Sequence, residues 1–188
     1  MSSAAWWPLR RAVEAVQSGG VIAYPTEAVY GLGCDPLEHA AVGRILAIKE
    51  RDAAKGLILI AAEFRQLLPY LAPLTPAVKK KVEASWPGPV TWVLPAAEHV
   101  PFWLSGGRET LAVRVTAHPL ARTLCEACDM ALVSTSANHG GHPPARSDLQ
   151  VRARFGEEVD YIVPGSVGPH TRPTEIRDGI TDRVLRAG

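Results

Sequence analysis

The chain has 188 residues, of which 47% are hydrophobic and 21% charged, values typical of one globular domain with a sizeable core. Its formal net charge of +1 gives no sign of an overall basic nucleic-acid-binding surface, although a local basic concavity stays open. No apolar run approaches the roughly 18 residues of a membrane span and no secretory signal pattern is present, so we expect a cytoplasmic protein without membrane contact, folded as a single domain over residues 1–188.

The chain opens with apolar residues at helical spacing from Leu9 to Val16, and Pro8 suits the first turn of this predicted helix. Residues 21–24 predict a buried strand that stops at Pro25. A hydroxyl, a carboxylate, a phenol and two glycines then follow within the stretch YPTEAVYGLG, residues 24–33. We interpret this stretch as a Gly-rich turn at the carboxyl end of a strand, where open α/β sheets bind ligands. A well-formed turn around a buried tyrosine is the competing interpretation.

Strands and helices alternate along the rest of the chain without strict βαβ regularity. Strands are predicted at residues 57–61, 90–94, 110–115, 131–134 and 161–163, and short edge strands at 174–177 and 184–186. Helices are predicted at 41–48, 64–71, 75–85, 118–127 and 147–156, and loops at 95–107 and 164–173. The pattern predicts the α/β class, with a twisted, mixed open sheet flanked by helices.

The three cysteines are an odd number in a chain with no export signal, which indicates a reducing compartment rather than a disulfide framework. Cys125 and Cys128 form a lone C-x-x-C pattern in a predicted helix. A redox or zinc role would need a thioredoxin-like context or a second pair of ligands, and the sequence offers neither. We therefore predict no metal ligands.

Cations and hydroxyl or amide groups recur at the predicted ends of strands and helices. They are Lys49, Arg51, Lys55, Arg114, Thr26, Ser134, Ser136 and Asn138. The P-loop and dinucleotide signatures are missing, as are the nucleophile and zinc-hydrolase motifs. Cations and hydroxyls without a positioned nucleophile and base suit the binding of a polyanion such as a nucleoside triphosphate. For Lys49 and Arg51, simple capping of a helix C-terminus is the alternative explanation.

Several stretches, in this order, closely resemble the YrdC-like family and in particular its short single-domain members. They are YPTEAVYGLG at 24–33, Lys49-x-Arg51 followed by Lys55-Gly56-Leu57, AVRV at 112–115 and STSAN at 134–138. The resemblance covers about residues 9–186 and implies a YrdC-like fold. It also implies a nucleotidyltransferase that joins L-threonine, bicarbonate and ATP into L-threonylcarbamoyladenylate and releases pyrophosphate. In the family this product serves the threonylcarbamoyladenosine modification of tRNA.

The resemblance also assigns site residues. For ATP they are Lys49, Arg51, Lys55, Thr110, Ser136, Asn138 and Arg186. Among them, Lys49 and Arg51 are expected to act in catalysis. For L-threonine they are Thr26, Tyr30, Arg114 and Ser134. Arg114 is expected to pair with the carboxylate of threonine, and Tyr30 either shapes the pocket or is purely structural. Mg²⁺ is expected on the ATP phosphates, and catalysis would be mainly orientation and charge neutralisation.

The chain departs from longer family members at a few positions. Lys55 stands where those members have an asparagine, and Ile60 stands where they place a histidine near threonine. Residues 174–176 read Thr-Glu-Ile instead of the more usual Ser-Thr-Ile. Selectivity for threonine over serine therefore stays open. No residue is assigned as a general base; Glu27 is the nearest candidate.

Two further expectations concern partners. Short family members generally rely on partner proteins that transfer the product to tRNA, so we expect such transfer-complex proteins, and direct contact with tRNA stays open. The alternative function is an RNA-binding module that acts on tRNA or ribosomal RNA precursors through the same basic cavity. The near-zero net charge and the lack of aromatic stacking motifs count against that alternative.

Overall fold

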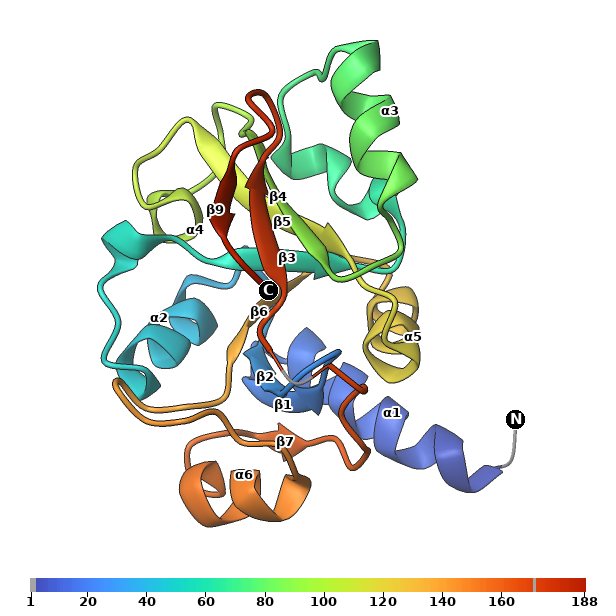
Figure 1. Cartoon of the computed structure of the whole chain (residues 1–188). Helices are drawn as coiled ribbons and strands as arrows, with labels where there is room; N and C mark the ends of the chain where they lie inside the picture. Colours follow the sequence, from blue (N-terminus) through green and yellow to red (C-terminus); the bar gives the residue numbers. More distant parts are fainter. Residues whose placement is uncertain (1–2, 171) are drawn as a thin grey trace.

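The computed structural model describes residues 3–170 and 172–188, and within them nine strands form one twisted sheet (Figure 1). The strands are β1 (Ile22–Pro25), β2 (Tyr30–Gly33), β3 (Ile58–Ala61), β4 (Val90–Pro95), β5 (Thr110–Val115), β6 (Leu132–Ser136), β7 (Tyr161–Ile162), β8 (Glu175–Asp178) and β9 (Val184–Arg186). Their order is β7-β1-β2-β6-β3-β5-β4-β8-β9. The pairs β1–β7, β3–β5 and β4–β8 are parallel and the others antiparallel, so the predicted mixed sheet is confirmed.

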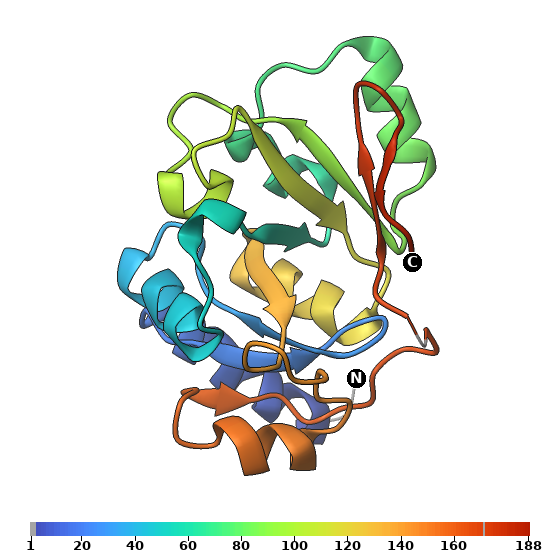
Figure 2. The ribbon, with the colours of Figure 1, turned by 60° about the vertical axis from the view of Figure 1, so that its left-hand side comes forward.

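Helices cover both faces of this sheet (Figure 2). They are α1 (Ser3–Gln17), α2 (His39–Ile48), α3 (Pro76–Ala84), α4 (Phe102–Ser105), α5 (Pro119–Cys128) and α6 (Asp148–Phe155), with short 3₁₀ helices η1 (Ala53–Lys55), η2 (Phe64–Gln66) and η3 (Leu68–Tyr70). One core cluster joins α1 and α5 to β1, and a larger one joins α2, α3, α4 and α6 to the sheet. Burial of these apolar faces is the main force that holds the layers together.

The β1–β2 hairpin corrects our interpretation of residues 24–33. Tyr30–Gly33 is a strand rather than a Gly-rich turn, and the turn itself is confined to Thr26–Val29, closed by the Thr26 amide on the Val29 carbonyl at 3.0 Å. Gly33 is required by packing, because a Cβ there would lie 2.7 Å from the ring of Tyr24. Glycine usually weakens a strand, so the pattern favoured a turn; close backbone approach explains the exception.

Other element predictions need smaller corrections. Helix α1 begins at Ser3, which places Pro8 inside it rather than in its first turn. The predicted loop 95–107 contains α4, a single turn too short for periodicity to reveal, and 64–71 is two 3₁₀ helices instead of one α-helix. Strand β8 is not an edge strand, since β9 pairs with its free side.

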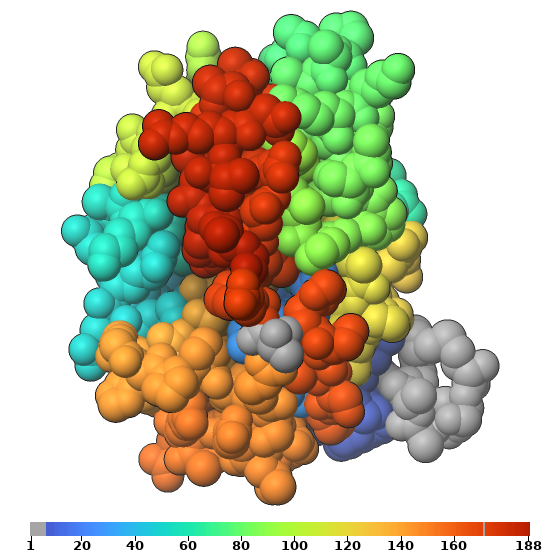
Figure 3. All heavy atoms as spheres, in the orientation of Figure 1, coloured from blue at the N-terminus to red at the C-terminus, as the bar shows by residue number. Residues whose placement is uncertain are grey.

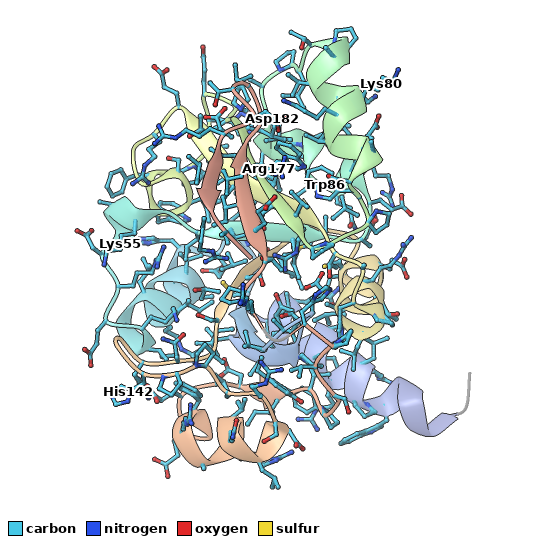
Figure 4. The ribbon with its side chains drawn as sticks, viewed as in Figure 1. Lys55, Lys80, Trp86, His142, Arg177 and Asp182 are labelled. Carbon is cyan, nitrogen blue, oxygen red and sulfur yellow. The ribbon has the colours of Figure 1, made fainter. Side chains whose placement is uncertain are left out.

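The C-terminal hairpin β8–β9 crosses the face of the molecule between the yellow segment of α4 and the green segment of α3 (Figure 3). Its parallel pairing with β4 and the antiparallel pairing of β9 hold it over the middle strands. On this hairpin, Arg177 and Asp182 lie together, with Nη1 and Oδ1 3.6 Å apart (Figure 4). No helix among the described residues is long and apolar enough to span a membrane.

Candidate active site

A cavity of about 590 Å³ opens between the middle strands and the C-terminal hairpin. Its walls come from the β1–β2 turn, from β3, β5 and β6, from the segments around η1 and α4, and from β8–β9. Its size falls within the range of about 300–1,000 Å³ typical of small-molecule sites. Predicted site residues that line it are Thr26, Arg51, Lys55, Thr110, Arg114, Ser134, Ser136 and Arg186. Predicted site residues from five separate parts of the chain therefore converge on one cavity.

Positive charge dominates the walls of the cavity. The lining cations are Arg51, Lys55, Arg108, Arg114 and Arg186, against one carboxylate, Asp178. Within the described residues only Arg114 of these cations has an ion pair. Burial lowers the pKa of Arg51, and the nearby charge of Arg108 lowers it further. Burial also lowers the pKa of Arg186, followed by the charge of Arg114. Crowded cations without counter-ions favour a polyanionic ligand.

Arg114 differs from the other cations because a buried carboxylate neutralises it. Its Nη2 donates to Oε2 of Glu27 at 3.2 Å, and both side chains are about 95% buried, with exposures of 5% and 4%. Nη1 donates to the hydroxyls of Thr91 and Thr174 at 3.1 and 2.9 Å. The guanidinium is thus held rigidly at the cavity wall, while its buried Nε has no hydrogen-bond partner within the described part of the chain.

Glu27 serves as the counter-ion of Arg114. Its Oε1 accepts from the Thr116 hydroxyl at 2.6 Å and from the Ala117 amide at 3.3 Å. Burial alone would raise the pKa of Glu27, but the charge of Arg114 and the Thr116 hydroxyl outweigh burial and lower it. A carboxylate with a lowered pKa and both oxygens engaged is a poor proton acceptor, which counts against Glu27 as a general base.

Thr26, Gly31 and Ser134 form a second part of the wall. The Thr26 hydroxyl donates to the Val29 carbonyl at 2.7 Å. A Cβ built on Gly31 would lie 3.4 Å from Thr26 Cγ2 and 3.5 Å from Ser134 Oγ. Gly31 thus leaves open a small space between two hydroxyl-bearing residues, and that space belongs to the cavity.

Lys49 braces the loop that carries Ser136 and Asn138 and does not line the cavity. Its Nζ donates to the Ser136 carbonyl at 2.5 Å, to the Asn138 carbonyl at 3.0 Å and to Asn138 Oδ1 at 3.1 Å. An ammonium group has three protons, so these contacts use its whole donor capacity. Burial, with the charge of Arg51 second, lowers the pKa of Lys49 to about 8.

Tyr30 and Asn138 are likewise absent from the cavity lining. The Tyr30 hydroxyl donates to the carbonyl of Gly165 at 2.7 Å and lies 3.2 Å from the carbonyl oxygen of Val163, and its ring is fully buried. These contacts favour the structural interpretation of Tyr30. Asn138 Oδ1 accepts from the Ser136 hydroxyl at 2.6 Å, so Asn138 orients a residue that does line the cavity.

Sequence reasoning missed several lining residues. Arg108 follows α4, just beyond the loop predicted at 95–107, and no motif marks it. Thr174 lines the cavity and bonds Arg114, although we noted it only as a departure from the family pattern. Glu27 does not line the cavity but holds Arg114 in place, and it lies inside the 24–33 motif, where we noted it only as the nearest candidate for a general base.

Two positions at which the sequence departs from longer family members, Ile60 and Lys55, have different surroundings in the structure. Ile60 is fully buried in the core beneath α5 and does not reach the cavity, whereas Lys55 does, with its side chain at the outer margin of the molecule (Figure 4). Cys125 and Cys128 are free thiols, and burial raises the pKa of Cys128 to about 11. Among the residues described, no group of three or more His, Cys, Asp or Glu could hold a metal ion.

Comparisons with known proteins agree with this architecture. A model of the Sua5/YciO/YrdC family, described as "Telomere recombination", matches residues 14–188. The threonylcarbamoyl-AMP synthase of Nitrosococcus oceani is 58% identical over 180 residues, covering 96% of this chain and 97% of the relative.

Two solved structures are similar over nearly the whole chain. Sua5 of P. abyssi complexed with L-threonine is 34% identical with a TM-score of 0.89 over 96% of this chain, which spans only 54% of that protein. E. coli YciO is 30% identical with a TM-score of 0.84, covering 96% of this chain and 88% of YciO. The chain belongs to the Sua5/YciO/YrdC family.

Proposed function

We propose that this chain is a threonylcarbamoyl-AMP synthase, which forms L-threonylcarbamoyladenylate and pyrophosphate from L-threonine, bicarbonate and ATP. The observation that carries the proposal is the cavity itself, which combines cations lacking counter-ions with one neutralised arginine and several hydroxyls. A relative that shares 58% of its residues carries that name. The reaction needs such a site because it brings two anions, a carbamate and a triphosphate, into contact.

The chemistry has two steps that balance without a further reactant. The threonine nitrogen bonds to the carbon of bicarbonate, and water leaves to give a carbamate. A carbamate oxygen then attacks the α-phosphorus of ATP, and the bond between that phosphorus and pyrophosphate breaks. We assign the protein the work of orientation and of neutralising the charge on both anions, because no free base faces the cavity in the described residues apart from Asp178.

Roles for individual residues follow from their surroundings. Arg51 and Lys55, which lack counter-ions, and the Ser136 hydroxyl bind the phosphates of ATP, while Thr110 and Arg186 contact the nucleotide. Magnesium enters with ATP, bound to its phosphates. Lys49 and Asn138 support ATP binding by holding the Ser136 loop.

The amino acid binds at the other part of the cavity. Arg114, fixed by Glu27 and Thr174, faces the carboxylate of L-threonine, and Thr26 and Ser134 offer hydroxyls beside it. Arginine is suited to this task because its planar fork matches a carboxylate. We propose further that partner proteins take the product and transfer it to tRNA.

The test is mass spectrometry of the purified protein incubated with ATP, magnesium, bicarbonate and L-threonine, beside reactions that omit threonine or bicarbonate. We expect a product with the mass of threonylcarbamoyl-AMP, matched by pyrophosphate and dependent on both omitted substrates. Folded protein that gives no adenylate would refute the proposal. Salt-dependent RNA affinity without turnover of ATP would instead support the RNA-binding alternative.

A further inference from the structure

Arg108 is a cavity cation that the motifs do not include. It follows α4, and its Nη1 donates to the carbonyl of Ser105 at 3.2 Å. Its side chain is exposed and lines the cavity at the same end as Arg51 and Lys55. None of these three has an ion pair within residues 3–170 and 172–188. The end of the cavity near η1 and α4 therefore carries positive charge that no carboxylate of the described residues pairs with.

Glycines place the guanidinium of Arg108 close to that of Arg51. A Cβ on Gly56 would lie 3.3 Å from Arg108 Nη1, and one on Gly106 would lie 2.7 Å from the same atom. Arg51 Nη2 donates to the carbonyl of Gly56 at 2.9 Å. Both guanidinium groups thus lie beside Gly56, one contributed by the segment after α2 and the other by the segment after α4. Gly56 and Gly106 also have positive φ angles of 66° and 65°, which side chains disfavour.

Two adjacent guanidinium groups without a carboxylate repel each other unless an anion lies between or against them. The buried Nε of Arg51 also lacks a hydrogen-bond partner in the described structure. By contrast, the opposite part of the cavity holds Arg114 with its own carboxylate. The cavity is therefore electrostatically uneven, and its η1–α4 end suits a ligand group with more than one negative charge.

We propose that Arg108 joins Arg51 in a two-guanidinium clamp for the β- and γ-phosphates of ATP, the part of the nucleotide that leaves as pyrophosphate. The inference rests on the proposed function and adds a binding residue to it. Guanidinium groups bind phosphate oxygens in bidentate fashion, and two of them match the paired phosphates of a diphosphate group. Departure of pyrophosphate is also eased where its developing charge is neutralised.

A purely structural role for Arg108 would rest on its hydrogen bond to the Ser105 carbonyl at the end of α4. The two roles separate in Arg108→Gln, which removes the charge but leaves an amide donor for that carbonyl. Arg108→Lys retains a charge without the planar fork. Arg122→Gln is the matched control, because Arg122 is partly exposed on α5, outside the cavity, and paired with Glu126 at 3.1 Å.

The experiment measures binding of inorganic pyrophosphate, a non-hydrolysable ATP analogue and AMP by isothermal titration calorimetry in the absence of threonine. Arg108→Gln should weaken pyrophosphate and the ATP analogue on the order of tenfold, as expected for a charge-assisted hydrogen bond. Binding of AMP and the melting temperature should not change. Arg108→Lys should fall between the wild type and Arg108→Gln, and Arg122→Gln should match the wild type.

Wild-type affinity for pyrophosphate in Arg108→Gln would overturn the proposal. So would an equal loss for AMP and pyrophosphate together with a lower melting temperature, which is the signature of the structural role. If Arg108→Gln does not fold, Arg108→Lys and Arg108→Met decide, because only the first keeps the charge. The result is independent of turnover: absence of adenylate synthesis by the wild type would refute the proposed function, while phosphate binding would still test the clamp.

Discussion

Removal of the Glu27 carboxylate should destabilise the fold strongly, because it leaves the buried charge of Arg114 without a counter-ion. Both side chains are almost fully buried, and the pair is joined at 3.2 Å. Breaking a buried ion pair from one side costs about 3–5 kcal/mol, since the remaining charge is left without a partner. That is a large part of the roughly 5–15 kcal/mol that a domain of this kind has in total. Glu27→Ala should therefore lower the urea midpoint markedly.

A double-mutant cycle isolates the pair from its surroundings. The cycle compares urea unfolding at pH 7 for Glu27→Ala, Arg114→Ala and the double variant. Circular dichroism first confirms that each variant is folded in the absence of urea. The double variant should lose less than the sum of the single losses, because it leaves no buried charge; we expect a coupling of about 1–3 kcal/mol. Additive losses would refute the reasoning that the two charges compensate each other.

The same pair predicts the response of stability to acid. The pKa of Glu27 is lowered in the folded protein. Its contribution is therefore fully present above the unfolded value of about 4.3 and is lost as pH falls through the folded value. The wild type should lose stability as the pH falls below about 4.3, and Glu27→Gln should show a shallower dependence over the same range. Parallel curves for the two proteins would show that Glu27 is not stabilised as the anion.

Other variants test the remaining assignments. Gly31→Ala should raise KM for L-threonine and leave KM for ATP unchanged, because the new Cβ enters the space between Thr26 and Ser134. Steady-state kinetics measure both KM values, and equal increases in the two would contradict a threonine subsite at this position. Lys49→Met should lower both the melting temperature and the activity, because it leaves the carbonyls of Ser136 and Asn138 without their hydrogen-bond donor. Lost activity at an unchanged melting temperature would instead favour direct contact of Lys49 with the substrate. Arg51→Gln should weaken ATP binding in calorimetry on the order of tenfold with threonine binding preserved.

Much of the fold was predictable because periodicity and turn chemistry are local. Strand β5 was predicted to the residue, and the helix predicted at 75–85 begins at Thr75, whose hydroxyl caps α3 by accepting from the Val78 amide. The Tyr30–Gly33 strand was not predictable from local preference, since Gly33 is explained only by its tight packing against Tyr24 and the backbone of β6. Strand β9 was expected at an edge and lies there, paired with its sequence neighbour β8, whereas the parallel pairing of β8 with β4 depends on long-range topology.

Site residues were predictable where they belong to a sequence motif. They were missed where only the fold brings them to the cavity. Family resemblance led to Arg51 and Ser136, which line the cavity. It gave no reason to distinguish Lys49, whose three donors are satisfied by the protein, from Arg51, whose Nε is not. Arg108 carries no motif and is brought to the cavity by the packing of α4 against η1, a contact between segments distant in sequence.

The spacing Lys49-x-Arg51 acquires a physical reason in the backbone between them. Lys49 ends α2 in a helical conformation, and Glu50 then adopts a left-handed φ of 47°, unusual for a residue with a side chain. The reversal at Glu50 sends the cations on either side of it in different directions. Lys49 reaches the carbonyls of the Ser136 loop, while Arg51 reaches Gly56 and the cavity. The turn after α2 thus holds the segment that ends β6 through Lys49 and supplies the guanidinium of Arg51 to the cavity wall.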